Sequence, residues 1–242
     1  MDLREQTFGK PVSMRAGWLL AALLAIAPLA SCKKPSAPAP HTLSPQEVRT
    51  AQAKAKQGDP EAQLTLGDAY VSGEGVQQDY TQAAKWYRQA AEAGKARAQA
   101  ALGDLYDAGQ GVPQDDAQAA KWYRRAAEQG LASAQYELAS LYAVGKGVRL
   151  DNAEALKWYL KAANQGDRLA QYNVGMRYSE GHGIKADPVL AYKWLSLASG
   201  QGLPDAARAL DALKQRMSSE QLARGRGLVS RFKERTAGAS AK

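Results

Sequence analysis

The strongest constraint on the fold is a repeat of 36 residues. Four tryptophans lie at this interval, and the same step links four tyrosines from Tyr70 onward and four aspartates from Asp79 onward. Repeats of this length occur in arrays whose units contact mainly their neighbours, so the chain is expected to form a solenoid. The tryptophans are Trp86, Trp122, Trp158 and Trp194.

Each unit begins with a predicted helix. Ala62, Leu66 and Tyr70 recur at the i, i+4 and i+8 spacing, which places them on one face of a helix. Asp59 followed by Pro60 marks the start, because aspartate caps a helix N-terminus and proline at the first position needs no N–H partner. The apolar face is expected to pack against a neighbouring helix.

A second helix is predicted in the same unit. Ala83, Trp86 and Ala90 form its apolar stripe, and the repeated tryptophans are expected to lie in the core. Asp79 and Gln82 have the spacing of a capping box, in which each side chain bonds the backbone N–H of the other residue. The pair recurs as Asp115 with Gln118 and Asp151 with Glu154.

The segment GEGVQQD at 73–79 joins the two helices. It could be a loop that holds a phosphate or a turn with only a structural role. A dinucleotide-type phosphate loop needs a preceding strand and a third glycine where Gln78 stands, and neither is present. Gly73 suits the left-handed residue that ends a helix, and Gly75 lets the chain reverse. We therefore expect a structural joint in every unit.

The stretch LGDAYVSGEGVQQDYTQAAKWYRQAAEAG at 66–94 and its three successors closely resemble the Sel-like repeat, a relative of the tetratricopeptide repeat. The resemblance implies an all-α fold, a right-handed α/α superhelical solenoid of four 36-residue helix pairs with helical caps and a concave inner face. Ala139 replaces a small packing glycine in the third copy, and Leu195 replaces a tyrosine in the fourth. Neither change removes a repeat.

Caps are expected at both ends, because terminal repeats otherwise expose an apolar face. Ser44 and Glu47 have the spacing of a capping box at the start of a lone helix. Pro204 and Leu210 align with a fifth first helix, and a last helix follows from Ser218. The predicted segments are a signal peptide (1–31), a Pro/Ala/Ser linker (32–43), an N-terminal capping helix (44–57), repeats 1 to 4 (58–93, 94–129, 130–165 and 166–201), C-terminal capping helices (202–235) and a tail (236–242).

The N-terminal segment has the pattern of an export signal. Arg15 precedes the apolar run GWLLAALLAIAPLA at 17–30, which is shorter than the roughly 20 residues needed to span a bilayer. Met14, directly before Arg15, is an alternative start to Met1.

The end of this segment, Leu29-Ala30-Ser31-Cys32, resembles the lipobox of bacterial lipoproteins. The resemblance implies that Cys32 is acylated and anchors the chain to a membrane of the cell envelope. Lys33 after the cysteine implies, by the same resemblance, the outer membrane facing the periplasm. The alternative is a plain signal peptide that leaves an exposed thiol.

Positive charge is concentrated at the C-terminus. The formal net charge is +8, and residues 214–242 contain eight Lys or Arg and two Asp or Glu. The repeats are therefore close to neutral, and the basic isoelectric point does not indicate nucleic-acid binding. In the last helix, Arg224, Arg231 and Arg235 form a candidate basic surface.

The sequence shows no recognisable catalytic or metal-binding set, and no cofactor is expected. One histidine, His41, lies in the linker, and the other, His182, lies in a turn position that varies between copies. Cys32 is the only cysteine, which excludes an internal disulfide. Ser230 and Lys233 fit the S-x-x-K pattern of penicillin-recognising enzymes, but the companion motifs S-D-N and K-T-G are missing.

Partner specificity is expected where the copies differ on the first helices. Two positions of each first helix, two and six residues after the Ala62-type alanine, are expected to face the groove. Aromatic and Met side chains on a rigid concave wall suit a peptide or a partner helix. The candidate contact residues are Leu64, Asp68, Asp104, Tyr136, Tyr172 and Met176.

Four lysines precede the tryptophans at the same 36-residue step and are interpreted as a solvated face, with polyanion binding as the alternative. They are Lys85, Lys121, Lys157 and Lys193.

Taken together, these features predict a monomeric, non-enzymatic scaffold that is lipid-anchored through Cys32 and binds a protein or peptide in its concave face. Two alternatives remain open. One is a peptidoglycan- or β-lactam-related enzyme that uses Ser230. The other is an envelope polysaccharide- or lipid-binding protein that uses the basic last helix.

Overall fold

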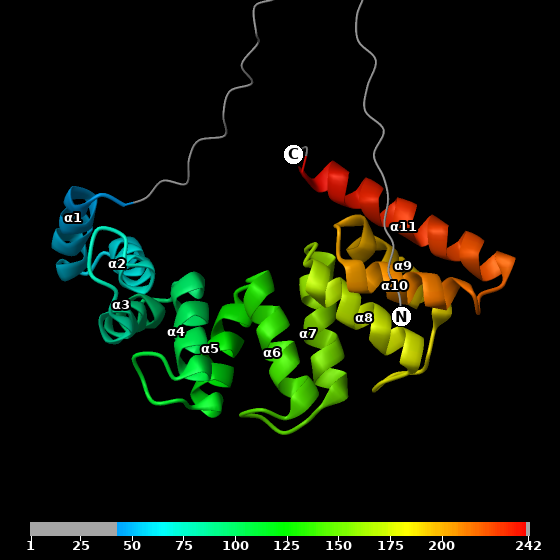
Figure 1. Cartoon of the computed structure of the whole chain (residues 1–242), viewed down its shortest axis with the longest axis horizontal. Coiled ribbons are helices and arrows are strands. Elements are labelled where there is room, and N and C mark those ends of the chain that lie inside the picture. Colours follow the sequence, from blue (N-terminus) through cyan, green and yellow to red (C-terminus); the bar gives the residue numbers. More distant parts are fainter. Residues whose placement is uncertain (1–42, 241–242) are drawn as a thin grey trace, which may run out of the picture. The chain divides into compact units, whose positions relative to one another are not determined.

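The computed structural model describes residues 43–240, and Figure 1 shows the succession of helices along this part of the chain. Cys32, His41 and the predicted signal peptide lie outside the described residues. Between residues 43 and 240 the chain forms eleven helices and no strand, so the predicted all-α solenoid is confirmed. The helices are α1 (Pro45–Lys56), α2 (Pro60–Ser72), α3 (Tyr80–Glu92), α4 (Ala96–Ala108), α5 (Asp116–Glu128), α6 (Ala132–Val144), α7 (Asn152–Asn164), α8 (Arg168–Glu180), α9 (Pro188–Gly200), α10 (Pro204–Lys214) and α11 (Ser219–Ser240).

Each helix from α1 to α9 packs against the next one in sequence, which is the contact pattern of a solenoid. The first helices of the four units are α2, α4, α6 and α8, and the second helices are α3, α5, α7 and α9. First helices also meet across units, α2 with α4 and α8 with α10, as expected for helices on the inner face. None of the described helices is long and apolar enough to cross a membrane.

The two ends of the array are covered by helices outside the four units. At the start of α1, the Ser44 hydroxyl and the Glu47 carboxylate form the predicted capping box. At the other end α11 packs on α9, with the Trp194 and Phe232 rings edge to face at a centroid distance of 5.5 Å. The helix continues to Ser240, past the boundary predicted after Arg235, so the tail expected from 236 is helical over most of its length.

The core is built from small residues and a few large ones. Alanines on both helices of each unit are completely buried, and Leu66, Leu102 and Leu138 are the large side chains that they enclose. Trp122 and Trp158 are each 7% exposed, as predicted for core residues. Small side chains bury little area each, so this core depends on close helix–helix approach.

The joints show what the glycine-rich segments do. Gly73 ends α2 with a φ of 77°, the left-handed conformation predicted for it. The Asp79 carboxylate then accepts hydrogen bonds from the backbone N–H groups of Thr81 and Gln82 at the start of α3. Aspartates of the other units cap α5, α7 and α9 in the same way.

The predicted capping boxes at these aspartates are wrong in their second half. The backbone N–H of Asp79 donates to the carbonyl of Tyr70, at the end of the preceding helix, with an N···O distance of 3.0 Å. Asp115, Asp151 and Asp187 donate to the corresponding tyrosine carbonyls. This N–H is therefore already hydrogen-bonded within the joint. The side chain three residues later cannot accept from it as a capping box requires.

The second glycine of each joint allows contact with the preceding unit. A Cβ atom on Gly147 would lie 2.1 Å from the carbonyl oxygen of Asp116, the first residue of α5, and one on Gly111 would lie 2.2 Å from Tyr80 in α3. These two joints thus rest on the first turn of the previous second helix, whereas Gly75 of the first joint lies against Leu43 and Ser44 at the start of α1. Only glycine permits this approach of backbone to backbone.

A ladder of buried glutamines links successive helices, and the sequence analysis missed it. The Gln135 amide nitrogen donates to the Ala127 carbonyl near the end of α5 at 3.1 Å, and its oxygen accepts from Gln165 after α7 at 2.8 Å. Gln99 and Gln171 repeat this arrangement. Gln63, which donates to the Ala55 carbonyl at 3.3 Å, and the other three glutamines are at most 5% exposed, and the recurring Ala-Gln pair was the available signal.

Gly147→Ala should destabilise the protein by about 2–4 kcal/mol. A positive φ costs alanine about 1–2 kcal/mol, and the clash with Asp116 adds overpacking strain of a similar size. Gly73→Ala is the matched control, because its φ is also positive but the nearest atom to the new Cβ lies at 3.5 Å. Urea unfolding of both variants measures the difference, and equal losses would contradict the role of the close approach.

Gln135→Leu should reduce the free energy of unfolding by about 1–3 kcal/mol, because it removes two hydrogen bonds, the one to the Ala127 carbonyl and the one from the Gln165 amide. Leucine is close to glutamine in size, so the loss reports the hydrogen bonds rather than a cavity. Gln110→Leu, at an exposed position, should change stability by less than about 0.5 kcal/mol. Chemical denaturation is the measurement, and a neutral Gln135→Leu variant would contradict this role of the ladder.

Candidate binding surfaces

The six predicted contact residues all lie on first helices, but their side chains have different surroundings. Leu64 is 4% exposed and belongs to the core, so it provides part of a floor rather than an accessible contact. Asp104 is exposed, and Asp68, Tyr136, Tyr172 and Met176 are partly buried. Their role in partner binding stays a prediction.

Two of the predicted contacts pair with tyrosines of the second helices. The Tyr87 hydroxyl donates to Asp68 at 2.8 Å, and the Tyr123 hydroxyl donates to Asp104 at 2.7 Å. Burial, followed by the neighbouring carboxylate, raises the pKa of both tyrosines well above the usual range. Each aspartate therefore links the two helices of its unit through one carboxylate oxygen, Oδ1.

This pairing explains why the position varies between copies. In the third unit Ser140 hydrogen-bonds to Tyr159. In the fourth unit both partners are apolar, and Met176 packs with Leu195 in one cluster. The residue on the first helix is thus polar in the three units that have a tyrosine nineteen positions later and apolar in the fourth, where leucine replaces that tyrosine, and the sequence already contained this signal.

The aromatic candidates of the third and fourth units are attached to the scaffold on one side. The Tyr136 ring lies against Tyr159 with a centroid distance of 5.6 Å and an angle of 58°. Tyr172 packs against the cluster that contains Ala191 and Leu195. Each of these two rings keeps part of its surface exposed, held in a fixed orientation by the buried part.

A depression of about 280 Å³ lies along the first helices of units 1 and 2 and the start of α6. Asp68 and Asp104 line it together with Leu64. Arg97, which the sequence did not single out, also lines it, and its guanidinium lies 3.5 Å from the Asp68 carboxylate. Ala100, Ala101, Leu131 and Ser133 complete the lining.

Glu137 on α6 adds to the negative charge of this face. Its pKa is raised to about 7, first by burial and then by the charges of Asp104, Asp107 and Asp167. A carboxyl group with this pKa changes its charge close to neutral pH. The inner face of units 2 and 3 therefore has a pH-dependent potential that composition alone could not indicate.

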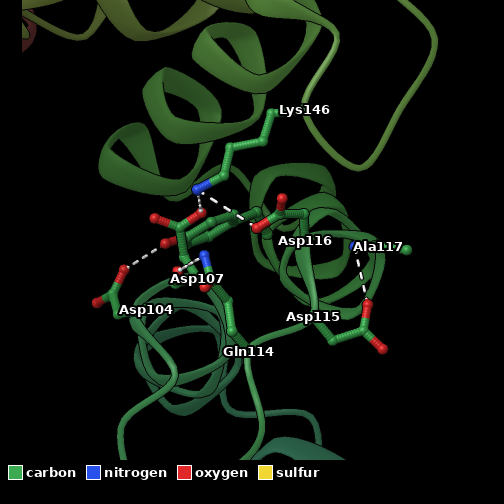
Figure 2. A network of polar contacts seen from close by, with 8 residues as sticks. Asp104, Asp107, Gln114, Asp115, Asp116, Ala117 and Lys146 are labelled. Atoms are coloured by element: carbon green, nitrogen blue, oxygen red, sulfur yellow. Dashed lines mark hydrogen bonds and ion pairs between the residues drawn. The ribbon is translucent and has the colours of Figure 1, made fainter.

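One lysine partly neutralises this region, as Figure 2 shows. The Lys146 ammonium, from the third joint, lies 2.7 Å from the Asp107 carboxylate and 3.3 Å from that of Asp116. Both carboxylates belong to unit 2, so the lysine connects two units beside the close contact of Gly147. The corresponding residues Glu74, Gln110 and His182 are not lysines, so this link is specific to the third joint.

The predicted basic surface divides into two parts. Arg231 and Arg235 line one depression together with Lys193 of α9, Leu228 and Phe232, whereas Arg224 is exposed and does not line it. The three other lysines of the 36-residue ladder are exposed, as predicted for a solvated face.

The candidate catalytic residues have other partners. The Ser230 hydroxyl donates to Glu234 at 2.8 Å, and the imidazole of His182 lies 3.1 Å from Glu180. No group of three potential metal ligands is found within the described part of the chain.

Glu137→Gln should stabilise the protein above neutral pH. The folded pKa of about 7 lies above the ordinary value of 4.5, so the folded state holds the proton more tightly and its stability falls as pH rises through this window. The neutral variant removes that loss, and we expect a gain of about 1 kcal/mol near pH 8 after allowance for solvent screening. Urea unfolding near pH 4 and pH 8 tests this, and a pH-independent difference would contradict it.

The comparisons with known proteins identify the repeats. The Sel1 repeat family matches at residues 60–95, 96–131, 132–167 and 168–203, the same step as the predicted units but two residues later. The search of curated proteins gave no match.

Two of the solved structures that are similar to this chain share more than a third of its residues in the aligned part. The first is c5321, a protective antigen of uropathogenic Escherichia coli with an SLR fold, at 42% identity and a TM-score of 0.68 over 70% of this chain and 36% of that one. The chain thus spans about a third of the length of that protein. The second is a Sel1 repeat protein from Oxalobacter formigenes, at 36% identity and a TM-score of 0.65 over 68% of each chain. With four tandem matches across more than half of its residues, the chain belongs to the Sel1 repeat family.

Proposed function

We propose that this protein is a scaffold that holds a protein or peptide partner against the inner face formed by its first helices. Sel1 repeat proteins are typically protein–protein interaction scaffolds, which supports this class of function. The observation that carries the proposal is the lined depression over units 1 and 2, together with the partly exposed Tyr136 ring of unit 3. Rigid aromatic surface beside fixed charges is typical of recognition sites.

The inner face has the rigidity that such recognition requires. Tyr136 is held by Tyr159, and Asp68 and Asp104 are held by tyrosine hydroxyls, so few side chains need ordering when a partner binds. The carboxylate oxygens not used by the tyrosines face the depression together with Arg97. The charges of Asp68, Asp104 and Arg97 can therefore set the position of a partner segment along this face, and the Tyr136 ring can bind it by apolar contact.

The cellular setting is also part of the proposal. Acylation of Cys32 would tether the solenoid to a membrane, and Lys33 favours the outer membrane with the solenoid in the periplasm. The linker that follows is rich in Pro, Ala and Ser. Segments of this composition act as extended spacers, which would keep the inner face accessible above the membrane surface.

Charge reversal in the depression should remove partner capture. Arg97 is suited to the test because its side chain is 71% exposed, so Arg97→Glu should leave the fold intact. Lys121→Glu is the matched control, an equal change of charge at an exposed site on a second helix. Crosslinking in cells followed by affinity purification should show at least tenfold lower recovery of the partners with Arg97→Glu and unchanged recovery with Lys121→Glu.

Tyr136→Ala tests the aromatic part of the same face. We expect a similar loss of recovered partners, with a thermal melt run in parallel because Tyr136 also packs on Tyr159. If both variants are folded and recover the same partners as the wild type, the proposed binding face is wrong.

A further inference from the structure

Helices α9 and α11 form a depression of about 220 Å³ that no part of the proposed scaffold function uses. It is lined by three cationic and two apolar side chains, Lys193, Arg231, Arg235, Leu228 and Phe232. The two helices are locked together beside it, because Gly225 leaves room for the Tyr192 ring and Phe232 packs on Trp194. The depression is therefore a feature of the packed fold.

Two of the three cations, Lys193 and Arg235, lie over aromatic rings. The Lys193 ammonium lies 3.8 Å from the centroid of Trp194 and 5.0 Å from that of Phe232. The Arg235 guanidinium lies 5.2 Å from the Phe232 centroid. The rings attract cations through their electron-rich faces and hold the charged ends at this position.

No carboxylate of the described chain forms an ion pair with any of these three side chains. The nearest acid in sequence, Glu234, accepts the hydrogen bond of Ser230. Arg231 uses one nitrogen to bond the carbonyl of Gly227, which leaves its other nitrogens available. The three positive charges repel one another, and a bound anion would lower this repulsion.

Lys193 differs from its equivalents in the other units. Lys85, Lys121 and Lys157 are exposed, and Lys157 pairs with Glu154 at 2.8 Å. Lys193 is partly covered, and burial followed by the charge of Arg235 lowers its pKa. The fourth unit therefore bears an electrostatic cost that the other three avoid.

We propose that this depression binds a phosphate group, held by Lys193, Arg231 and Arg235. Arginine presents a planar fork that matches two phosphate oxygens, and the lysine adds a third donor. Leu228 and Phe232 provide an apolar wall beside the charges, so the group can be carried by a lipid or by a small soluble molecule. This inference rests on α9 and α11 and is independent of the proposed inner face.

The test uses the full chain and two charge-matched double variants of α11. Arg231→Gln with Arg235→Gln removes two charges from the depression, whereas Arg224→Gln with Arg226→Gln removes two from exposed positions of the same helix. Thermal unfolding in inorganic phosphate is compared with unfolding in chloride at equal ionic strength. Vesicle sedimentation compares phosphatidylcholine alone with phosphatidylcholine mixed with phosphatidylglycerol.

We expect phosphate to raise the melting temperature of the wild type and of the Arg224/Arg226 variant but not of the Arg231/Arg235 variant. A site for a lipid headgroup should also give a preference for the phosphatidylglycerol vesicles that falls about tenfold in the Arg231/Arg235 variant and less than twofold in the other. Phosphate stabilisation without this preference would assign the site to a soluble phosphate. Equal effects in the two variants, or no response to either probe, would overturn the proposal.

Discussion

The solenoid depends on the approach of each glycine joint to the backbone of the previous unit. Gly147 lies so close to Asp116 that no side chain fits between them, and Gly111 approaches the backbone of Tyr80 in the same way. Because the contact joins backbone to backbone, it fixes the position of one unit on the next regardless of surface side chains. The aspartate caps, the tyrosine carbonyl bonds and the glutamine ladder can recur only because this spacing is constant.

This constraint also explains the composition of the core. Units held this close leave little room between helices, so alanine occupies most buried positions and the large residues are confined to a few sites. Gly103 shows how closely the two helices of a unit approach, because a Cβ atom there would lie 2.8 Å from the Tyr123 ring. In the third unit Ala139 occupies the corresponding place, so the helices accommodate one additional carbon there.

The sequence predicted the features that neighbouring residues determine and missed those that depend on how one helix meets another. The left-handed Gly73 and the aspartate caps follow from local rules, and the structure confirms both. The second half of each capping box failed because the Asp79 N–H bonds the preceding helix, a partner that the local motif does not include. Leu64 was placed in the groove because a period of 3.6 residues does not fix how a helix is rotated about its axis.

Lys193 shows how a repeated residue acquires a different physical role at the end of an array. Its side chain occupies the same position in its unit as Lys121, yet α11 packs on α9 and brings Phe232, Arg231 and Arg235 beside it. The sequence periodicity makes Lys193 and Lys121 equivalent, because it records the unit and not the neighbour that covers it. In a solenoid, the residues whose environments differ most from their sequence equivalents are therefore those under a cap, and for the same reason a distinct binding site can form there without disturbing the repeat.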